Sequence, residues 1–156
     1  MSDDLRELYQ EVILEHGRNP RNCHHPDAPT HAAHGDNPLC GDQLDVYLTV
    51  GADDRIAEAA FEGRGCAISV ASASLMTEAL RGKTLTEARE LFKKIHEMCT
   101  SDEGGGIDVA DGDFERLAAL SGVRQFPMRV KCATLAWHTM KAAMEGNAEV
   151  STEDEV

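Results

Sequence analysis

Apolar residues near the start of the chain repeat with the period of an amphipathic helix. Leu5, Leu8, Val12 and Ile13 fall on one face of a 3.6-residue repeat, and Gly17 is suited to follow the last turn. The pattern therefore predicts a first helix that ends near this glycine.

The segment from Arg18 to Leu39 has the composition of a long irregular stretch. It holds four prolines together with several histidines and asparagines, and proline interrupts helices and interior strands. Long segments without regular structure are uncommon in a compact domain and are often functional or mobile. We therefore expect no helix here, and we expect part of the segment to be poorly ordered.

Strict alternation of side chains predicts a β-hairpin in the next part of the chain. Leu44, Val46, Leu48 and Val50 alternate with more polar neighbours, which is the period of a half-buried strand. The turn sequence GADD follows, and the run from Ile56 to Phe61 is suited to a return strand. The two strands are expected to pair antiparallel.

The rest of the chain is predicted to be mainly helical. An Ala- and Ser-rich run suggests a helix packed closely through small side chains, and Thr84 with Glu87 has the spacing of a capping box. The acidic, Gly-rich stretch TSDEGGGIDVADGD is expected to be a loop. The predicted helices run from Cys66 to Leu80, from Thr84 to about Met98, from Phe114 to Leu120 and from Met128 to Met144.

Together these elements predict an α+β domain, with a small antiparallel β-sheet of two or three strands packed against about five helices. The length of 156 residues suits a single hydrophobic core. We assign residues 1–146 to one domain and residues 147–156 to an acidic, flexible tail.

Composition and charge exclude several classes of protein. Lys and Arg total 15 against 28 for Asp and Glu, a net charge of −13 that repels nucleic-acid phosphates and anionic membranes. We find no apolar run of membrane-spanning length and no secretory signal at the N-terminus. The five cysteines include no C-x-x-C pair, so we expect reduced thiols and a cytoplasmic location.

Three of the cysteines lie in settings that favour a thiolate. Cys66 follows a Gly-rich loop at a predicted helix start, where backbone N–H groups and the helix dipole stabilise an anion. Cys132 lies early in the last predicted helix, beside Arg129 and Lys131, and Cys40 lies in the segment NPLCGD. Thiolates are both nucleophiles and soft metal ligands.

Asp42 extends this set to four candidate ligands. In an extended segment alternate side chains point the same way, so Cys40 and Asp42 can address one ion. Three thiolates and one carboxylate suit the tetrahedral shell of zinc. The gaps between the residues match no standard zinc finger, however. The residues alone leave the alternative that Cys66 and Cys132 are small, buried side chains in Ala-rich helices.

The segments that contain these cysteines resemble a known family. GDNPLCGD, GRGCAISVASASLMTEALRGKT and PMRVKCATLAWHTM are similar to the three cysteine-bearing motifs of iron–sulfur cluster assembly proteins of the NifU/IscU superfamily. The resemblance starts at LYQEVILEHGRNPRN and covers nearly the whole chain. Two details resemble the SufU-type branch: a longer stretch between Lys83 and Cys132, and Lys131 where the classical scaffolds carry a histidine.

The resemblance implies a SufE/NifU-like fold and a zinc ion held by Cys40, Asp42, Cys66 and Cys132. It further implies that Cys40 accepts sulfur from the persulfide of a pyridoxal-phosphate-dependent cysteine desulfurase of the SufS type, with Arg129 beside the site. Downstream iron–sulfur assembly proteins are the other implied partners. The expected function is that of a zinc-dependent sulfurtransferase. The alternatives are a scaffold for a transient [2Fe–2S] cluster and a zinc-stabilised interaction module without transfer chemistry.

The remaining cysteines and most histidines receive no metal-binding role. Cys23 and Cys99 match none of the three motifs. Histidines in a proline-rich segment are more often solvated than ligands, and those on predicted helices are expected to be structural or exposed. These residues are His24, His25, His31 and His34 in the segment, and His16 and His138 on helices.

Overall fold

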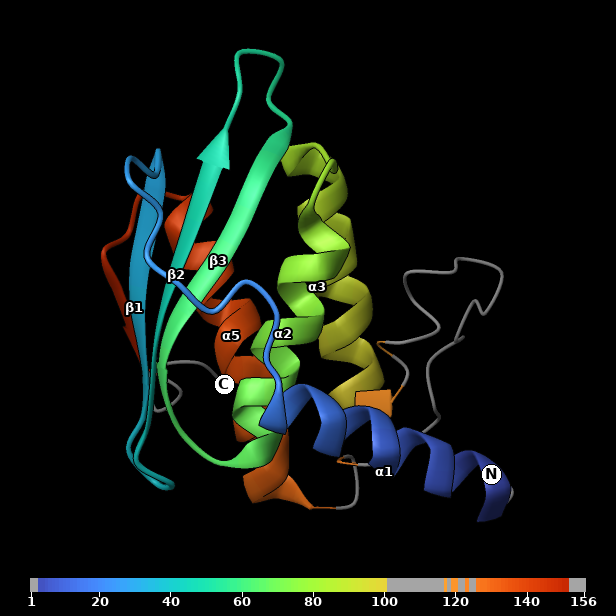
Figure 1. Ribbon diagram of the computed structural model, residues 1–156. Coiled ribbons are helices and arrows are strands. Elements are labelled where there is room, and N and C mark those ends of the chain that lie inside the picture. Colours follow the sequence, from blue (N-terminus) through green and yellow to red (C-terminus); the bar gives the residue numbers. More distant parts are fainter. Residues whose placement is uncertain (1–2, 101–116, 118, 121–122, 124–125, 152–156) are drawn as a thin grey trace.

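The computed structural model describes residues 3–100, 117, 119–120, 123 and 126–151, and it confirms the predicted α+β class. In chain order the elements are α1 (Asp3–Arg18), β1 (His31–Asn37), β2 (Asp42–Val50), β3 (Ile56–Arg64), α2 (Ala67–Leu80), α3 (Leu85–Thr100), α5 (Pro127–Met144) and β4 (Glu149–Ser151). As Figure 1 shows, α2 and α5 lie against the sheet, while α1 contacts α2 and α3 contacts α5.

The sheet is larger than the sequence predicted. It has four strands in the order β3-β2-β1-β4, and β4 runs parallel to β1, so the sheet is mixed rather than antiparallel. The described residues contain four helices, whereas about five were expected. The acidic loop after its first residue, Thr100, and most of the short helix predicted from Phe114 to Leu120 lie outside the described residues, and Thr100 itself ends α3. No helix in the described part of the chain has the length and apolar character needed to cross a bilayer.

The hairpin of β2 and β3 follows the alternation read from the sequence. Leu44, Val46 and Leu48 are completely buried beneath the helices, and Phe61 pairs with Val46 on the same face. Because one face of each strand is apolar, a slip of one residue would turn this whole set toward solvent. The alternation therefore fixes the register of the sheet.

Strand β1 corrects the prediction that the whole segment from Arg18 to Leu39 is irregular. Its seven residues, HAAHGDN, contain no large apolar side chain, yet all seven pair with β2. Helix α5 crosses β1 so closely at Gly35 that a β-carbon there would lie 1.9 Å from Thr139 Oγ1. The strand thus depends on tertiary contacts that an apolar pattern does not record.

Strand β4 differs from the expectation that residues 147–156 form a flexible tail. Glu149–Ser151 pair in parallel with His34, Gly35 and Asp36 of β1, and Val150 packs against the core. A single apolar residue was too little signal to predict a strand. The pairing covers part of the outer edge of β1.

The helices begin and end close to the predicted residues, and small side chains let α2 and α5 approach each other. Ser72 Oγ donates to the carbonyl of Ala133 at 2.5 Å and accepts from the indole N–H of Trp137 at 3.1 Å. The predicted capping box is present at α3, where Thr84 and Glu87 exchange backbone-to-side-chain hydrogen bonds. The resulting rigid pair α2–α5 carries two of the candidate cysteines at or near its helix starts.

Candidate metal centre

Three segments that are distant in the sequence meet at one end of the sheet, at the lower end in Figure 1. Asn37 and Asp42 form the last residue pair of β1 and β2, and the loop between them carries Cys40. Gly41 completes this loop with a positive φ of 74°, which glycine adopts without strain. The start of α2 and the first turns of α5 close the site from the helical side.

Three of the four predicted ligands are brought together here. The ligand atoms of Cys40, Asp42 and Cys132 all lie within 4.8 Å of one another, and the sulfurs of Cys40 and Cys132 are 3.5 Å apart. Cys40 is exposed, whereas Asp42 and Cys132 are buried. One soft ligand therefore faces solvent, and two ligands approach from the protein interior.

Cys66 stands at the edge of this group rather than inside it. It caps α2, its sulfur accepts a hydrogen bond from the backbone N–H of Ser69 at 3.5 Å, and its own N–H donates to Asp42 Oδ1 at 2.9 Å. It is not among the three residues whose ligand atoms lie within 4.8 Å of one another. Its sulfur nevertheless forms a hydrogen bond with the thiol of Cys132.

A hydrogen bond between the thiols of Cys66 and Cys132 shifts their pKa values in opposite directions. The hydrogen bond from Cys132, helped by backbone N–H groups of Ser69 and Ile68, lowers the pKa of Cys66 to about 6. The same hydrogen bond, reinforced by burial, raises the pKa of Cys132 well above its usual range. The Cys66 thiol therefore loses its proton more readily than the Cys132 thiol, and a bound cation would favour loss of both protons.

Asn37 is a site residue that the sequence analysis did not single out. It is completely buried, and its side-chain Nδ2 lies 3.2 Å from Asp42 Oδ2 and 3.7 Å from Cys132 Sγ. Its backbone oxygen accepts hydrogen bonds from the N–H groups of Cys40 and Gly41. The only signal in the sequence was its place in NPLCGD, where a polar residue before proline is usually attributed to the turn.

A glycine allows β3 to lead into α2 beside the buried carboxylate. A β-carbon at Gly65 would lie 2.6 Å from Asp42 Oδ1 and 3.0 Å from its Cγ. The Gly-rich loop recognised in the sequence therefore has a definite purpose. It provides the room in which the Asp42 side chain accepts its two hydrogen bonds.

Arg129, which was expected beside the site, makes no direct bond to the candidate ligands within the described residues. It lies exposed in the first turn of α5, and within the described part of the chain no hydrogen bond or ion pair joins its guanidinium to the candidate ligands. Cys23 and Cys99 lie apart from the group, one exposed and the other in the core. They were excluded from the site on sequence grounds, and neither belongs to the cluster of possible ligands.

The histidines of residues 24–34 do not form a second centre. His24 and His34 pair separately with Glu58 and Asp45, at 2.8 and 2.9 Å. Over the described ranges, the group around Cys40 is the only cluster of three or more possible metal ligands. His16 and His138 are buried on helices, in line with a structural role.

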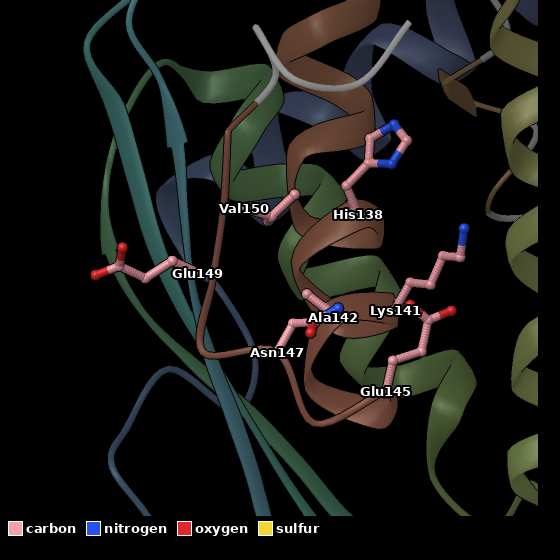
Figure 2. A pocket seen from close by; sticks show the side chains of 7 residues that line it. All are labelled: His138, Lys141, Ala142, Glu145, Asn147, Glu149 and Val150. Carbon is pink, nitrogen blue, oxygen red and sulfur yellow. The ribbon is translucent and has the colours of Figure 1, made fainter.

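A hollow of about 220 Å³ lies toward the other end of α5, next to β4. Figure 2 shows that the side chains of His138 and Lys141 point to one side of the helix, while Glu149 points the opposite way. The groups that line the hollow therefore do not converge on one point. None of the four predicted ligands lines it.

Comparison with known families identifies the fold and the motifs. Residues 8–133 match the family described as NifU-like N terminal domain. The chain belongs to this family. The resemblance of the three cysteine-bearing motifs is thereby confirmed, and the NifU-like match includes Cys40, Asp42, Cys66 and Cys132.

Individual relatives of this NifU-like chain share most of its length. It is 41% identical over 140 residues to the zinc-dependent sulfurtransferase SufU of Bacillus subtilis, covering 88% of this chain and 90% of that one. It is 39% identical over 145 residues to the iron–sulfur cluster assembly scaffold protein IscU of Streptococcus pyogenes, covering 92% and 87%. A crystal structure of a putative iron–sulfur cluster assembly scaffold protein for the SUF system, from Fervidobacterium islandicum, has a TM-score of 0.78 at 32% identity and covers 89% and 98%. The chain is thus a member of the SufU/IscU group of iron–sulfur cluster assembly proteins.

Proposed function

We propose that this protein is a zinc-dependent sulfur acceptor that receives persulfide sulfur from a cysteine desulfurase. The observation that carries the proposal is the exposed sulfur of Cys40, held 3.5 Å from the buried sulfur of Cys132 in a group of possible metal ligands. An acceptor must be reachable by the donor, and Cys40 is the exposed thiol of that group. The SufU relative at 41% identity carries the name of a zinc-dependent sulfurtransferase.

The donor set suits zinc. We assign Cys40, Asp42, Cys66 and Cys132 as its ligands, since three thiolates and one carboxylate match the coordination number and softness of Zn²⁺. Cys66 would join through the sulfur that already hydrogen-bonds Cys132. When bound, zinc would keep the sulfurs as thiolates at neutral pH and tie the three segments together. Four anionic ligands around a divalent ion leave about −2 net charge, which exposed Arg129 would offset from the first turn of α5.

The transfer step requires only the Cys40 thiolate and the donor persulfide. Cys40 attacks the outer sulfur of the donor R–S–SH, a new S–S bond forms at Cys40 Sγ, and the S–S bond of the donor breaks. The products are a Cys40 persulfide, –S–SH, and the donor thiolate R–S⁻, so no oxidant or reductant is needed. The attack is a case of thiol–disulfide exchange, in which a thiolate is the nucleophile.

Cys40 is well placed for this attack. It lies on a short loop beside a flexible glycine, so its sulfur can move toward a donor without disturbing a strand or helix. Cys66 and Cys132, by contrast, belong to the cap of α2 and to α5. We assign the donor to the pyridoxal-phosphate-dependent cysteine desulfurases of the SufS type, acting in the cytoplasm with further iron–sulfur assembly proteins downstream.

The alternative function is a scaffold on which a [2Fe–2S] cluster is assembled and passed to apoproteins. The same three thiols favour it, because thiolates bind iron–sulfur clusters as well as zinc. The IscU relative from Streptococcus pyogenes carries the name of a scaffold protein. Both functions use the same group of residues. They differ in what the protein carries, which is a sulfur atom in the first case and a [2Fe–2S] cluster in the second.

One experiment separates these functions. Freshly purified protein is analysed for metal and then incubated with a SufS-type desulfurase and cysteine, and persulfide is located by mass spectrometry of peptides. The proposal predicts about one zinc per chain, faster desulfurase turnover, and persulfide on Cys40. Cys40→Ser should abolish the stimulation, and Cys23→Ser, which changes an exposed thiol outside the group, should preserve it. Cluster transfer without stimulation supports the scaffold, and tight zinc with neither activity supports an interaction module.

A further inference from the structure

The three thiols of the candidate metal centre differ in the N–H groups that reach them. The sulfur of Cys66 accepts a hydrogen bond from the backbone N–H of Ser69, and the sulfur of Cys132 accepts one from the side-chain amide of Asn37 at 3.7 Å. Within the ranges that the structure describes, no N–H group donates to the sulfur of Cys40, whose partner is the sulfur of Cys132. Among the described residues, the sulfurs of Cys66 and Cys132 thus have N–H donors and the sulfur of Cys40 has none.

Asn37 is fixed in the position from which it donates. It is completely buried as the last residue of β1, and its amide lies 3.2 Å from Asp42 Oδ2 as well as 3.7 Å from Cys132 Sγ. Its carbonyl oxygen accepts the N–H of Cys40 at 3.3 Å and the N–H of Gly41 at 2.9 Å. One residue therefore contacts two candidate ligands through its side chain and shapes the loop of a third through its backbone.

The short distance between Cys40 and Cys132 would allow the sulfur received by Cys40 to react further with Cys132. A persulfide on Cys40 would have two sulfurs near Cys132 Sγ, which lies 3.5 Å from Cys40 Sγ in this structure and would be a thiolate with zinc bound. Attack on the outer sulfur would give a Cys132 persulfide and the Cys40 thiolate. Attack on Cys40 Sγ would give a Cys40–Cys132 disulfide and release hydrosulfide, HS⁻, so the transferred sulfur would be lost from the protein. The exposure of Cys40 does not prevent either reaction.

We propose that Asn37 is a positioning residue that keeps the transferred sulfur on Cys40 by lowering the reactivity of Cys132. An N–H···S hydrogen bond stabilises negative charge on the sulfur and makes that sulfur a poorer nucleophile, as such bonds do around metal-bound thiolates. In the part of the chain that the structure describes, no N–H group donates to Cys40, so its sulfur is not made a poorer nucleophile in this way. The inference rests on the proposed sulfur-acceptor function. It adds the residue that determines which of two adjacent thiols carries the transferred sulfur.

The test compares Asn37→Ala with the parent protein, both loaded with zinc. Each is given sulfane sulfur from inorganic polysulfide, and peptides are analysed for a Cys132 persulfide and a Cys40–Cys132 disulfide, with released hydrosulfide measured in parallel. Loss of a hydrogen bond to a charged sulfur should change its rate of attack about tenfold, which corresponds to about 1.4 kcal/mol. We expect the Cys132 products and the hydrosulfide to form about tenfold faster in Asn37→Ala.

A matched control separates this role from a general loss of stability. Thr77→Ala removes another buried polar side chain, which hydrogen-bonds Asn22 at 3.1 Å and touches none of the candidate ligands. It should behave like the parent. Asn37→Leu keeps the approximate size of the side chain and removes the amide donor without adding a charge, and it replaces the alanine variant if that variant unfolds.

The outcomes are decisive in both directions. Faster formation of Cys132 products in the Asn37 variants, with Thr77→Ala unchanged, supports the proposal. Rates in the Asn37 variants equal to those of Thr77→Ala overturn it. Because polysulfide replaces the desulfurase, the comparison remains valid even if the protein takes no sulfur from that enzyme, a result that would count against the proposed function alone.

Discussion

Replacing Gly65 with alanine should weaken zinc binding without unfolding the protein. The new β-carbon would lie 2.6 Å from Asp42 Oδ1, so the carboxylate must shift by about 0.8 Å to reach an ordinary contact of 3.4 Å. The carboxylate is completely buried and has little room. Gly65 has no positive φ, so alanine fits its backbone and the effect is confined to the clash.

The magnitude follows from the two hydrogen bonds that fix Asp42. They come from Cys66 N at 2.9 Å and from Asn37 Nδ2 at 3.2 Å. Hydrogen bonds to charged groups contribute about 1.5–3 kcal/mol each. Losing one of them corresponds to about 2 kcal/mol, or roughly 30-fold weaker zinc binding.

The assay is competition for zinc between the variant and a chromophoric chelator, with circular dichroism as the check on folding. Gly17→Ala serves as the control, because its β-carbon would meet only ordinary contacts at 3.4 Å or more. The control should bind zinc as the parent does. A Gly65→Ala protein with unchanged zinc affinity would refute the assignment of Asp42 as a ligand.

Three further predictions follow from the site and the helix ends. Removing zinc should lower the melting temperature, because a metal that binds only the folded chain stabilises it; equal melting curves before and after chelation would contradict this. In metal-free protein, alkylation of Cys66 should rise with a midpoint near pH 6, well before that of Cys132, which peptide mass spectrometry can follow. Thr84→Ala should cost about 1 kcal/mol in urea unfolding. Hydrogen bonds with Thr84 lower the pKa of Glu87. The stability that the ionised Glu87 contributes is therefore present above the ordinary pKa of a glutamate and is lost as the pH falls through the lowered pKa. The cost of Thr84→Ala should become smaller in acid for the same reason.

Elements with a strong local period were predictable from the sequence. The alternation of Leu44, Val46 and Leu48 specified a strand with one buried face, and Thr84 with Glu87 marked the start of α3. In both cases the signal lies within a few neighbouring residues. Such signals depend on the backbone geometry of a single element and need no knowledge of the rest of the fold.

Elements that depend on distant partners were not predictable. Strand β1 has no large apolar residue, and it forms because Gly35 lets α5 approach and because β2 offers a partner. The candidate ligands were recognisable by residue type, because three thiols and a carboxylate are together the donor set of a metal site. Asn37 was not, because an amide becomes a site residue only through its contacts with Asp42 and Cys132.

The separation of the ligands along the chain has a consequence for biosynthesis. Cys40 and Cys132 are 92 residues apart, and the second lies in α5, which also covers β1 and β2. A ribosome makes the chain from its N-terminus, so the first sulfurs emerge well before the last one and before the helix that holds it. A growing or partly folded chain therefore presents only some of the ligands, and it binds the ion more weakly than the folded site does. Tight binding of the ion requires that the last helix has docked, so only the completely folded chain holds the metal firmly.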